Sequence, residues 1–296
     1  MAASRQIRDS AEIINAEFNL ELNNALSELN HGKQRDCSCE ETAAYLLKSF
    51  GLRINNPFEI RLKTRTDIDR YPGLSTANKT YFKNSIYYRG GWNPLKRLAD
   101  RKMTREIDPI LNFDGIYMGF DKLTHFTGSG YLYYKAYRKS LSGGYSDSEA
   151  KKAAVDIGIK WEKSILGVKA NGVFSFADLE ANFQGMLLAI DLCNPDHKYL
   201  EMEARGNWIL KREVDLRDYI NPFWNEIYNP CGFKDSRGTA VKKNMMEYCT
   251  DKSIDSLLTR YDCHADSSFS AKYLKNQVDQ SRIPDPTSFH IKNICP

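Results

Sequence analysis

The sequence predicts a mainly α-helical protein, a helical bundle-like core with irregular loops and a cysteine-rich C-terminal segment. Apolar residues recur at helical spacing in several segments, and capping sequences open three of these segments. Four of the seven cysteines lie after residue 230, among turn-forming residues. We divide the chain into a helical core over residues 1–205 and a helical, disulfide-stapled extension over residues 206–296 that packs on it.

Residues 9–51 are predicted to form a helical hairpin. Apolar residues over 13–29 repeat every three or four positions, which is typical of an amphipathic helix. A capping box at residues 38–41, Ser-Cys-Glu-Glu, opens a second helix that ends at Gly51. Because Cys37 lies in the turn, we expect a disulfide from there to tie the hairpin to a distant part of the chain.

Residues 52–115 are predicted to be loop-rich, because proline and glycine interrupt them repeatedly, with a short strand over residues 58–62. The segment is rich in aromatic and basic residues. We select Tyr88, Arg89 and Trp92 as candidate substrate-binding residues, since an exposed loop of this kind can line a groove for a sugar chain or peptide. The alternative is that these rings only pack the loop onto the core.

Residues 116–193 are predicted to hold the central helices. A tyrosine-rich helix runs over 121–141, a helix capped by Ser146 ends near Gly167, and a loop over 168–174 leads to a third helix that ends at Leu192. Ser175 and Asp178 form its capping box. Further helices are expected around residues 214–228, 240–248 and 254–261.

These central helices carry the candidate site. Asp121 and His125 are four residues apart, as are Asp178 and Asn182, and Glu162 lies on the helix between them. Residues four apart share a helix face, so we expect these polar groups to converge on one centre. Gly128 and Gly130 follow directly, at a cost of about 1 kcal/mol each relative to alanine, which favours tight helix crossing or the approach of a ligand.

Each member of this group also has a structural alternative. His125 is a metal ligand or a base oriented by Asp121, or else the two form a structural pair. Glu162, beside Trp161, is expected to have a raised pKa suited to a general acid, or else it is a solvated surface glutamate. Asp178 is a second carboxylate of the site or only a helix cap, and Asn182 binds substrate or joins a helix–helix seam.

Composition narrows the cellular setting. The net charge is only +4 and no dense Lys/Arg block occurs, so we expect no nucleic-acid partner. No segment is long and apolar enough to span a bilayer. With no Cys-x-x-Cys pair, the seven cysteines favour disulfides, hence a periplasmic or secreted protein whose signal peptide has been removed. Reduced, buried cysteines in a cytosolic protein are the alternative.

The spacing of the polar residues resembles a known pattern. Asp-x-x-x-His-Phe (121–126), a later Glu162 and Asp-Leu-x-Ala-Asn-x-x-Gly (178–185) are similar to the pattern of VanZ-like proteins and of related envelope lipoproteins. The similarity covers about 65 residues of the 296. It implies an envelope setting and a shared polar centre between helices, but no particular reaction. VanZ-like proteins are membrane-embedded, whereas this chain has no predicted span.

From these observations we predict a hydrolase of an envelope polymer such as peptidoglycan. Glu162 would be the general acid, Asp178 or Asp121 the second carboxylate, and His125 a positioning group. No cofactor is required, although in a metal-assisted variant Asp121, His125, Glu162 and Asp178 would bind a divalent ion. The alternative is a non-catalytic envelope scaffold or binding protein whose polar cluster is a hydrogen-bond network. The sequence does not predict an oligomeric state.

Overall fold

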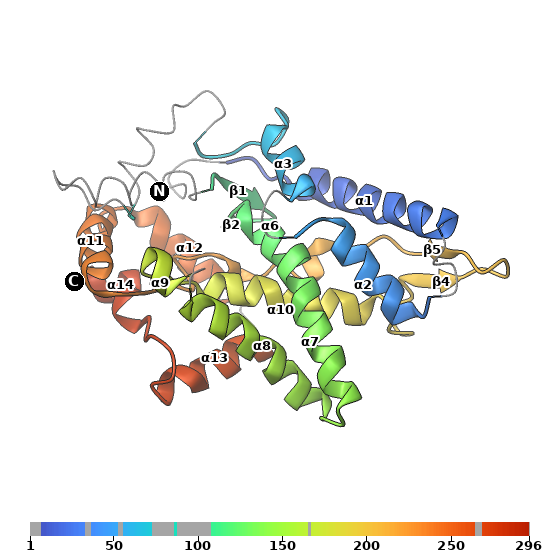
Figure 1. Cartoon of the computed structure of the whole chain (residues 1–296). Helices are drawn as coiled ribbons and strands as arrows, with labels where there is room; N and C mark the ends of the chain where they lie inside the picture. Colours follow the sequence, from blue (N-terminus) through green and yellow to red (C-terminus); the bar gives the residue numbers. More distant parts are fainter. Residues whose placement is uncertain are drawn as a thin grey trace.

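The computed structural model describes residues 7–32, 37–52, 56–72, 86–87, 108–164, 167–263 and 268–295. It is mainly α-helical with little strand, as predicted (Figure 1). The longer helices are α1 (Ala11–His31), α2 (Cys39–Ser49), α3 (Pro57–Thr64), α7 (Gly130–Ser142), α8 (Asp147–Lys163), α10 (Phe176–Asp191), α11 (Asp235–Met245), α12 (Lys252–Asp262) and α13 (Phe269–Asp279). The short ones are α6 (Asp121–Thr124), α9 (Val168–Asn171), α14 (Ile291–Ile294), the π-helix η2 (His125–Ser129) and the 3-10 turns η3 (Leu216–Asp218), η4 (Pro222–Trp224), η5 (Met246–Tyr248) and η6 (Thr287–Phe289).

Within the described ranges, three small antiparallel sheets of two strands each join these helices. β1 (Ile110–Phe113) pairs with β2 (Ile116–Gly119), β3 (Val173–Phe174) with β6 (Gly232–Phe233), and β4 (Leu200–Met202) with β5 (Trp208–Leu210). The β1–β2 turn places Asp114 and Gly115 at φ of 49° and 82°, the left-handed pair that a tight hairpin needs. This hairpin, which the sequence analysis did not predict, leads directly into α6.

Helix α10 is the centre of the fold, and it is apolar and buried on nearly every face. α7 and α8 pack on it and on each other, and α2 and α13 contact it as well (Figure 1). Glycines allow η2 and α7 to cross α10 closely. If Gly185 had a Cβ, that atom would lie 1.7 Å from the carbonyl oxygen of Phe126 in η2. If Gly130 had one, it would lie 2.8 Å from the Cα of Gly185. The tight crossing expected at Gly130 is therefore present.

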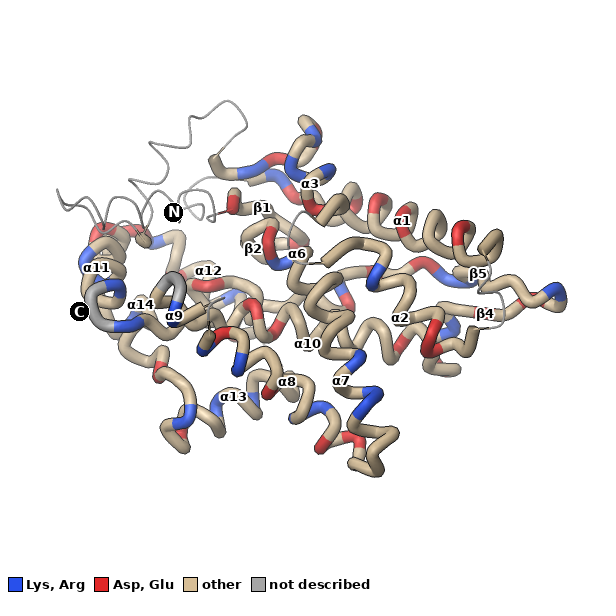
Figure 2. The backbone as a smooth tube through the Cα atoms, in the orientation of Figure 1, with Lys and Arg blue, Asp and Glu red and all other residues tan. Residues whose placement is uncertain are grey.

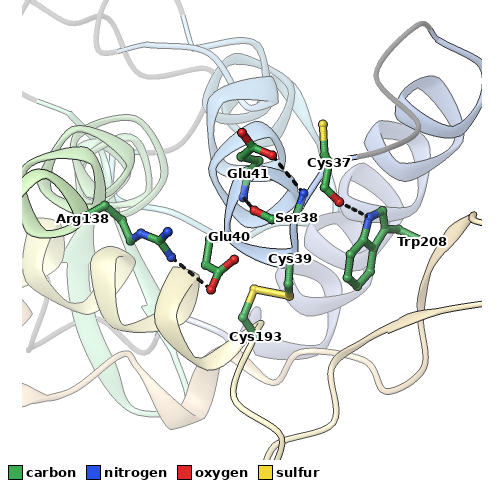
Figure 3. Close-up of a disulfide and its surroundings, with 8 residues drawn as sticks. All are labelled: Cys37, Ser38, Cys39, Glu40, Glu41, Arg138, Cys193 and Trp208. Carbon is green, nitrogen blue, oxygen red and sulfur yellow. Dashed lines mark hydrogen bonds and ion pairs between the residues drawn. A yellow bond between two sulfur atoms is a disulfide. The ribbon is translucent and has the colours of Figure 1, made fainter. Parts of the chain in front are cut away.

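The N-terminal hairpin forms as predicted from α1 and α2, including the Ser38–Glu41 capping box (Figure 3). The disulfide at its turn, however, involves Cys39 and not Cys37. Cys39 bonds to Cys193, 154 residues away, just beyond the end of α10. Cys37 points away from this disulfide, and its backbone carbonyl accepts a hydrogen bond from the indole of Trp208 (Figure 3).

Three predicted elements are wrong. Residues 58–62 belong to helix α3 and not to a strand, because the Asn56 side chain caps the helix and Pro57 occupies its first position. Residues 214–228 form only the 3-10 turns η3 and η4, which the side chains of Asp215 and Asn221 cap. The expected loop over 168–174 contains α9 and β3.

The hydrophobic core continues past residue 205 into the C-terminal extension. Val214, Leu216 and Trp224 are fully or almost fully buried in the main cluster around α10. A smaller second cluster joins α11, α12 and the C-terminal turns, and the Cys249–Cys295 disulfide staples it, as expected for this extension. The other three cysteines, Cys37, Cys231 and Cys263, are not part of these two disulfides.

No helix within the described ranges has the length and hydropathy needed to cross a membrane, in agreement with the sequence. Charged residues of both signs are distributed over the described helices, with only acidic ones along α1 and only basic ones along α7 (Figure 2).

Candidate functional site

The structure brings together three of the predicted site residues. Asp121 begins α6, His125 begins η2, and Asp178 lies in the first turn of α10. One potential ligand atom from each lies within 4.8 Å of the other two. The Nε2 atom of His125 is 3.2 Å from Oδ2 of Asp178. Two neighbouring helical segments therefore present two carboxylates and an imidazole to one point.

His125 lies at the start of a π-helical segment between α6 and α7. Such segments are rare and occur frequently at functional sites, because the wider turn shifts the side chains relative to a regular helix. Here the segment also places the Phe126 carbonyl against Gly185 of α10, so glycine at that position permits the close approach. The sequence analysis predicted a regular helix over these residues.

Lys122 is a buried cationic residue of the site that was not among the predicted site residues. Its ammonium group contacts Oδ2 of Asp121 at 2.9 Å, Oδ1 of Asp178 at 2.6 Å and Oε1 of Glu226 at 2.8 Å. Burial alone would lower the pKa of Lys122, but the three carboxylates outweigh it and raise the pKa well above the ordinary value. Lys122 is therefore charged and fixes one oxygen of each carboxylate.

Glu226 brings the C-terminal extension into the site. Its second oxygen, Oε2, accepts a hydrogen bond of 2.5 Å from the hydroxyl of Tyr87. Burial, followed by the charge of Glu226, raises the pKa of Tyr87 well above its usual range, so the phenol stays neutral. Burial and Glu226 likewise raise the pKa of the nearby Cys231 thiol, which makes it a poor nucleophile.

Asn182 lies on the buried side of His125, away from solvent. It is fully buried, and its Oδ1 is 2.9 Å from Nδ1 of His125. This contact orients the imidazole so that Nε2 faces Asp178. Of the two positions considered for Asn182, this buried contact corresponds to the helix–helix seam, here between η2 and α10.

Glu162 lies apart from the three converging groups. It is buried, and its Oε2 accepts a hydrogen bond of 3.1 Å from the backbone N–H of Ser175, the N-cap of α10. The surface-glutamate alternative is therefore wrong. The same contact explains Asp178: its backbone N–H donates to the Ser175 hydroxyl, but Glu162 takes the reciprocal position of the expected capping box. The Asp178 carboxylate turns instead to Lys122 and His125.

A second acidic group adjoins the site through Asp121. Lys63 of α3 pairs with both Glu59 and Asp108, and the hydroxyl of Thr124 donates to Glu59. Burial raises the pKa of Asp108 to about 7, and the negative charge of Asp121 adds to the effect. The whole region therefore carries more acidic than basic groups.

The site opens to solvent on one side. The side chains of Asp121 and Glu226 are 34% and 33% exposed, whereas those of His125 and Asp178 are each 14% exposed and that of Lys122 only 2%. Asp121 and Glu226 are therefore the most accessible groups of the site, and Lys122 is the most buried.

The other predicted substrate-binding residues, Tyr88, Arg89 and Trp92, lie outside the described residues. Their neighbour Tyr87 is described, and its hydroxyl contacts Glu226.

No family model, curated protein or solved structure matches this chain. The resemblance to VanZ-like proteins therefore stays a prediction, and the arguments about function below rest on the geometry of the site.

Proposed function

We propose that this protein is a metal-assisted hydrolase of a polymer of the bacterial cell envelope, such as peptidoglycan. The main support is the convergence of Asp121, His125 and Asp178, whose ligand atoms lie within 4.8 Å of one another. Two carboxylate oxygens and one imidazole nitrogen suit a divalent first-row metal, and the open side leaves positions for water and substrate.

The charges of the site favour a bound cation. Asp121, Asp178 and Glu226 surround a single ammonium group, that of Lys122. With His125 neutral, the three carboxylates and one lysine sum to a charge of −2. A divalent cation would balance this charge, and the more exposed position of Asp121 gives it an entry path.

The surrounding residues hold the three ligands in place. Lys122 holds Asp121 and Asp178 through ion pairs, and Asn182 holds the ring of His125 through its contact with Nδ1. Partners of this kind orient metal ligands, and their loss typically costs 10- to 100-fold in affinity or activity. A bound divalent ion would lower the pKa of a coordinated water to about 7 and so supply the nucleophile.

The envelope setting is supported by the cysteines. Two disulfides, Cys39–Cys193 and Cys249–Cys295, are compatible with an oxidising compartment, which for a bacterial protein means the periplasm or the exterior. The resemblance of residues 121–185 to VanZ-like and envelope lipoprotein sequences supports the same setting.

The alternative function, a non-catalytic scaffold, also has one observation in its favour. Lys122 is almost completely buried and ties α6, α10 and the Glu226 segment together, as a structural network would. In that case the polar cluster would fix helix packing and no variant in it would change a reaction.

Turnover of purified peptidoglycan separates the two functions. The assay compares the wild type with Asp178→Asn and His125→Gln, with and without chelator, and takes Asp147→Asn on the exposed face of α8 as the matched control. The proposal predicts soluble fragments from the wild type and the control, and a loss of about 100-fold or more in both site variants and with chelator. No release by the wild type, or equal release by all variants, would contradict it.

Glu162→Gln tests the predicted general acid in the same assay. If Glu162 donates a proton to the leaving group, the variant loses turnover without loss of stability. If Glu162 only holds the N-terminus of α10, the variant melts at a lower temperature and keeps its turnover at temperatures where it is folded. The second result would remove Glu162 from the mechanism and leave the three converging residues in place.

A further inference from the structure

A second site, separate from the polar cluster, lies where the C-terminal extension closes on α10. A partly open cavity of about 450 Å³ is lined by five segments: α10, η4 with the residues after it, α12, α13 and the stretch from η6 into α14. Ligand pockets typically measure about 300 to 1,000 Å³, so this cavity has the volume for a small organic molecule.

The wall of this cavity is mainly apolar. Its lining includes Phe176, Phe223, Ile227, Leu258, Leu274 and Val278. The one buried carboxylate in the lining, Glu180, is already satisfied: its oxygens accept hydrogen bonds from Gln184, Asn221 and Ser268. The Glu180 carboxylate therefore needs no cationic ligand as a partner. The apolar part of the cavity suits a hydrocarbon chain.

The rim carries three lysines and two exposed aspartates, Asp262 and Asp279, and therefore a small excess of positive charge. Lys272 and Lys275 lie one turn apart on α13, and both are exposed. Within the described ranges, no carboxylate forms an ion pair with either of them. The third lysine of the rim, Lys292, faces Asp262 at 3.7 Å. The ammonium groups of Lys272 and Lys275 are thus available to an anionic group at the mouth of the cavity.

We propose that this cavity binds an amphiphile with an apolar chain and an anionic head, a carboxylate or a phosphate, whose head contacts Lys272 and Lys275. The site is independent of the polar cluster. Phe176 and Glu180 face the cavity, whereas Asp178 and Asn182 face the cluster, about 200° further around α10. The inference therefore does not depend on the proposed hydrolase activity.

Calorimetric titration with short amphiphiles tests this inference. The probes are dodecyl phosphate, laurate and dodecyltrimethylammonium, each below its micellar concentration. We expect saturable 1:1 binding of one or both anionic probes, and no binding of the cationic one. Preference between phosphate and carboxylate then identifies the head group.

Two variants locate the binding. Lys272→Gln with Lys275→Gln should weaken the anionic probe about three- to tenfold, because exposed ion pairs contribute only modestly. The matched control is Lys139→Gln with Lys160→Gln, exposed lysines of α7 and α8, which should bind like the wild type. Ala271→Phe should fill the cavity and abolish binding. Equal binding of cationic and anionic probes, no binding at all, or no effect of the lysine pair would overturn the inference.

Discussion

Lys122 determines the electrostatics of the candidate site, yet its importance does not show in the sequence. An Asp-Lys pair at the start of a helix is usually solvated, and only the fold brings Asp178 and Glu226 around this ammonium group. Glu226 lies 104 residues from Lys122 in the chain, so no local pattern could link the two. Tyr87 is likewise far from Glu226 in the chain, so no local pattern could link these two residues either. By contrast, the i to i+4 spacing of Asp121 and His125 was sufficient to select residues that the structure brings together.

Lys122→Met should destabilise the protein by about 3–5 kcal/mol, because it leaves carboxylates facing each other without their counter-charge. Urea unfolding at pH 7 measures this free energy. Lys151→Met is the control, since it removes a surface ion pair, that with Asp147, and should cost less than about 0.5 kcal/mol. Equal effects of the two variants would refute the role assigned to Lys122.

The raised pKa of Lys122 also predicts a pH dependence. Its folded pKa lies above the unfolded value, so its contribution to stability is complete below about pH 10.4 and is lost as the pH rises through the folded pKa. The alkaline decline in the free energy of unfolding should therefore be steeper in the wild type than in Lys122→Met. Parallel alkaline profiles would contradict this.

The raised pKa of Asp108 predicts a loss of stability with rising pH in a lower pH range. Its pKa is raised to about 7, so the folded protein holds this proton more tightly than the unfolded chain does, and stability falls as the pH rises from about 4 to about 7. Asp108→Asn cannot ionise and should show a shallower decline over this range, measured by urea unfolding. Asp196→Asn, on an exposed turn, is the control. An unchanged slope in Asp108→Asn would show that Asp108 ionises normally.

At the scale of elements, helix capping was the most reliable signal in the sequence. Ser38 and Ser146 begin α2 and α8 with complete capping boxes, as predicted. The errors came from short segments. The periodicity of a short run such as 58–62 fits either a strand or a helix. Here the Asn56 cap and Pro57 at the first helical position select the helix. The π-helical turn at His125 depends on contact with α10, which no sequence window contains.

The crossing of α7 and α10 should tolerate no side chain at Gly185. Gly185→Ala would place a methyl group against the Phe126 carbonyl, and backbone cannot yield as a flexible side chain does, so we expect a loss of about 2–3 kcal/mol or more. Thermal unfolding is the measurement. At Gly143, on the exposed end of α7, the nearest atom to a Cβ is 3.3 Å away, and Ala there should cost less than about 1 kcal/mol. A mild effect at Gly185 would mean that the helices are further apart.

The two disulfides should contribute unequally. Cys39–Cys193 spans 154 residues and Cys249–Cys295 spans 46, so the chain-entropy model assigns about 5 and about 4 kcal/mol to them. The double serine variant of the first pair should therefore unfold at a lower urea concentration than that of the second. The reverse order would show that the C-terminal staple matters more for the fold than the link between α2 and α10.

At the scale of the whole molecule, the fold unites segments that the sequence presents as separate. The fold class, the hairpin and the central helices followed from local patterns. The place of the C-terminal extension did not, because the burial of Trp224 in the main core and the contact of Glu226 with Lys122 are both long-range. The extension is thus part of the candidate site, and it also lines the cavity below α10.

The central claim, that Asp121, His125 and Asp178 form a divalent-metal centre, is tested most directly by metal content. Purified protein would be stripped with chelator, equilibrated with Mn²⁺ or Zn²⁺, dialysed, and analysed for bound ion per chain. We expect one ion per chain in the wild type and in Glu162→Gln, and its loss in His125→Gln and Asp178→Asn. A wild type that retains no more metal than Asp178→Asn would contradict the account and leave Lys122 and its carboxylates as a structural network.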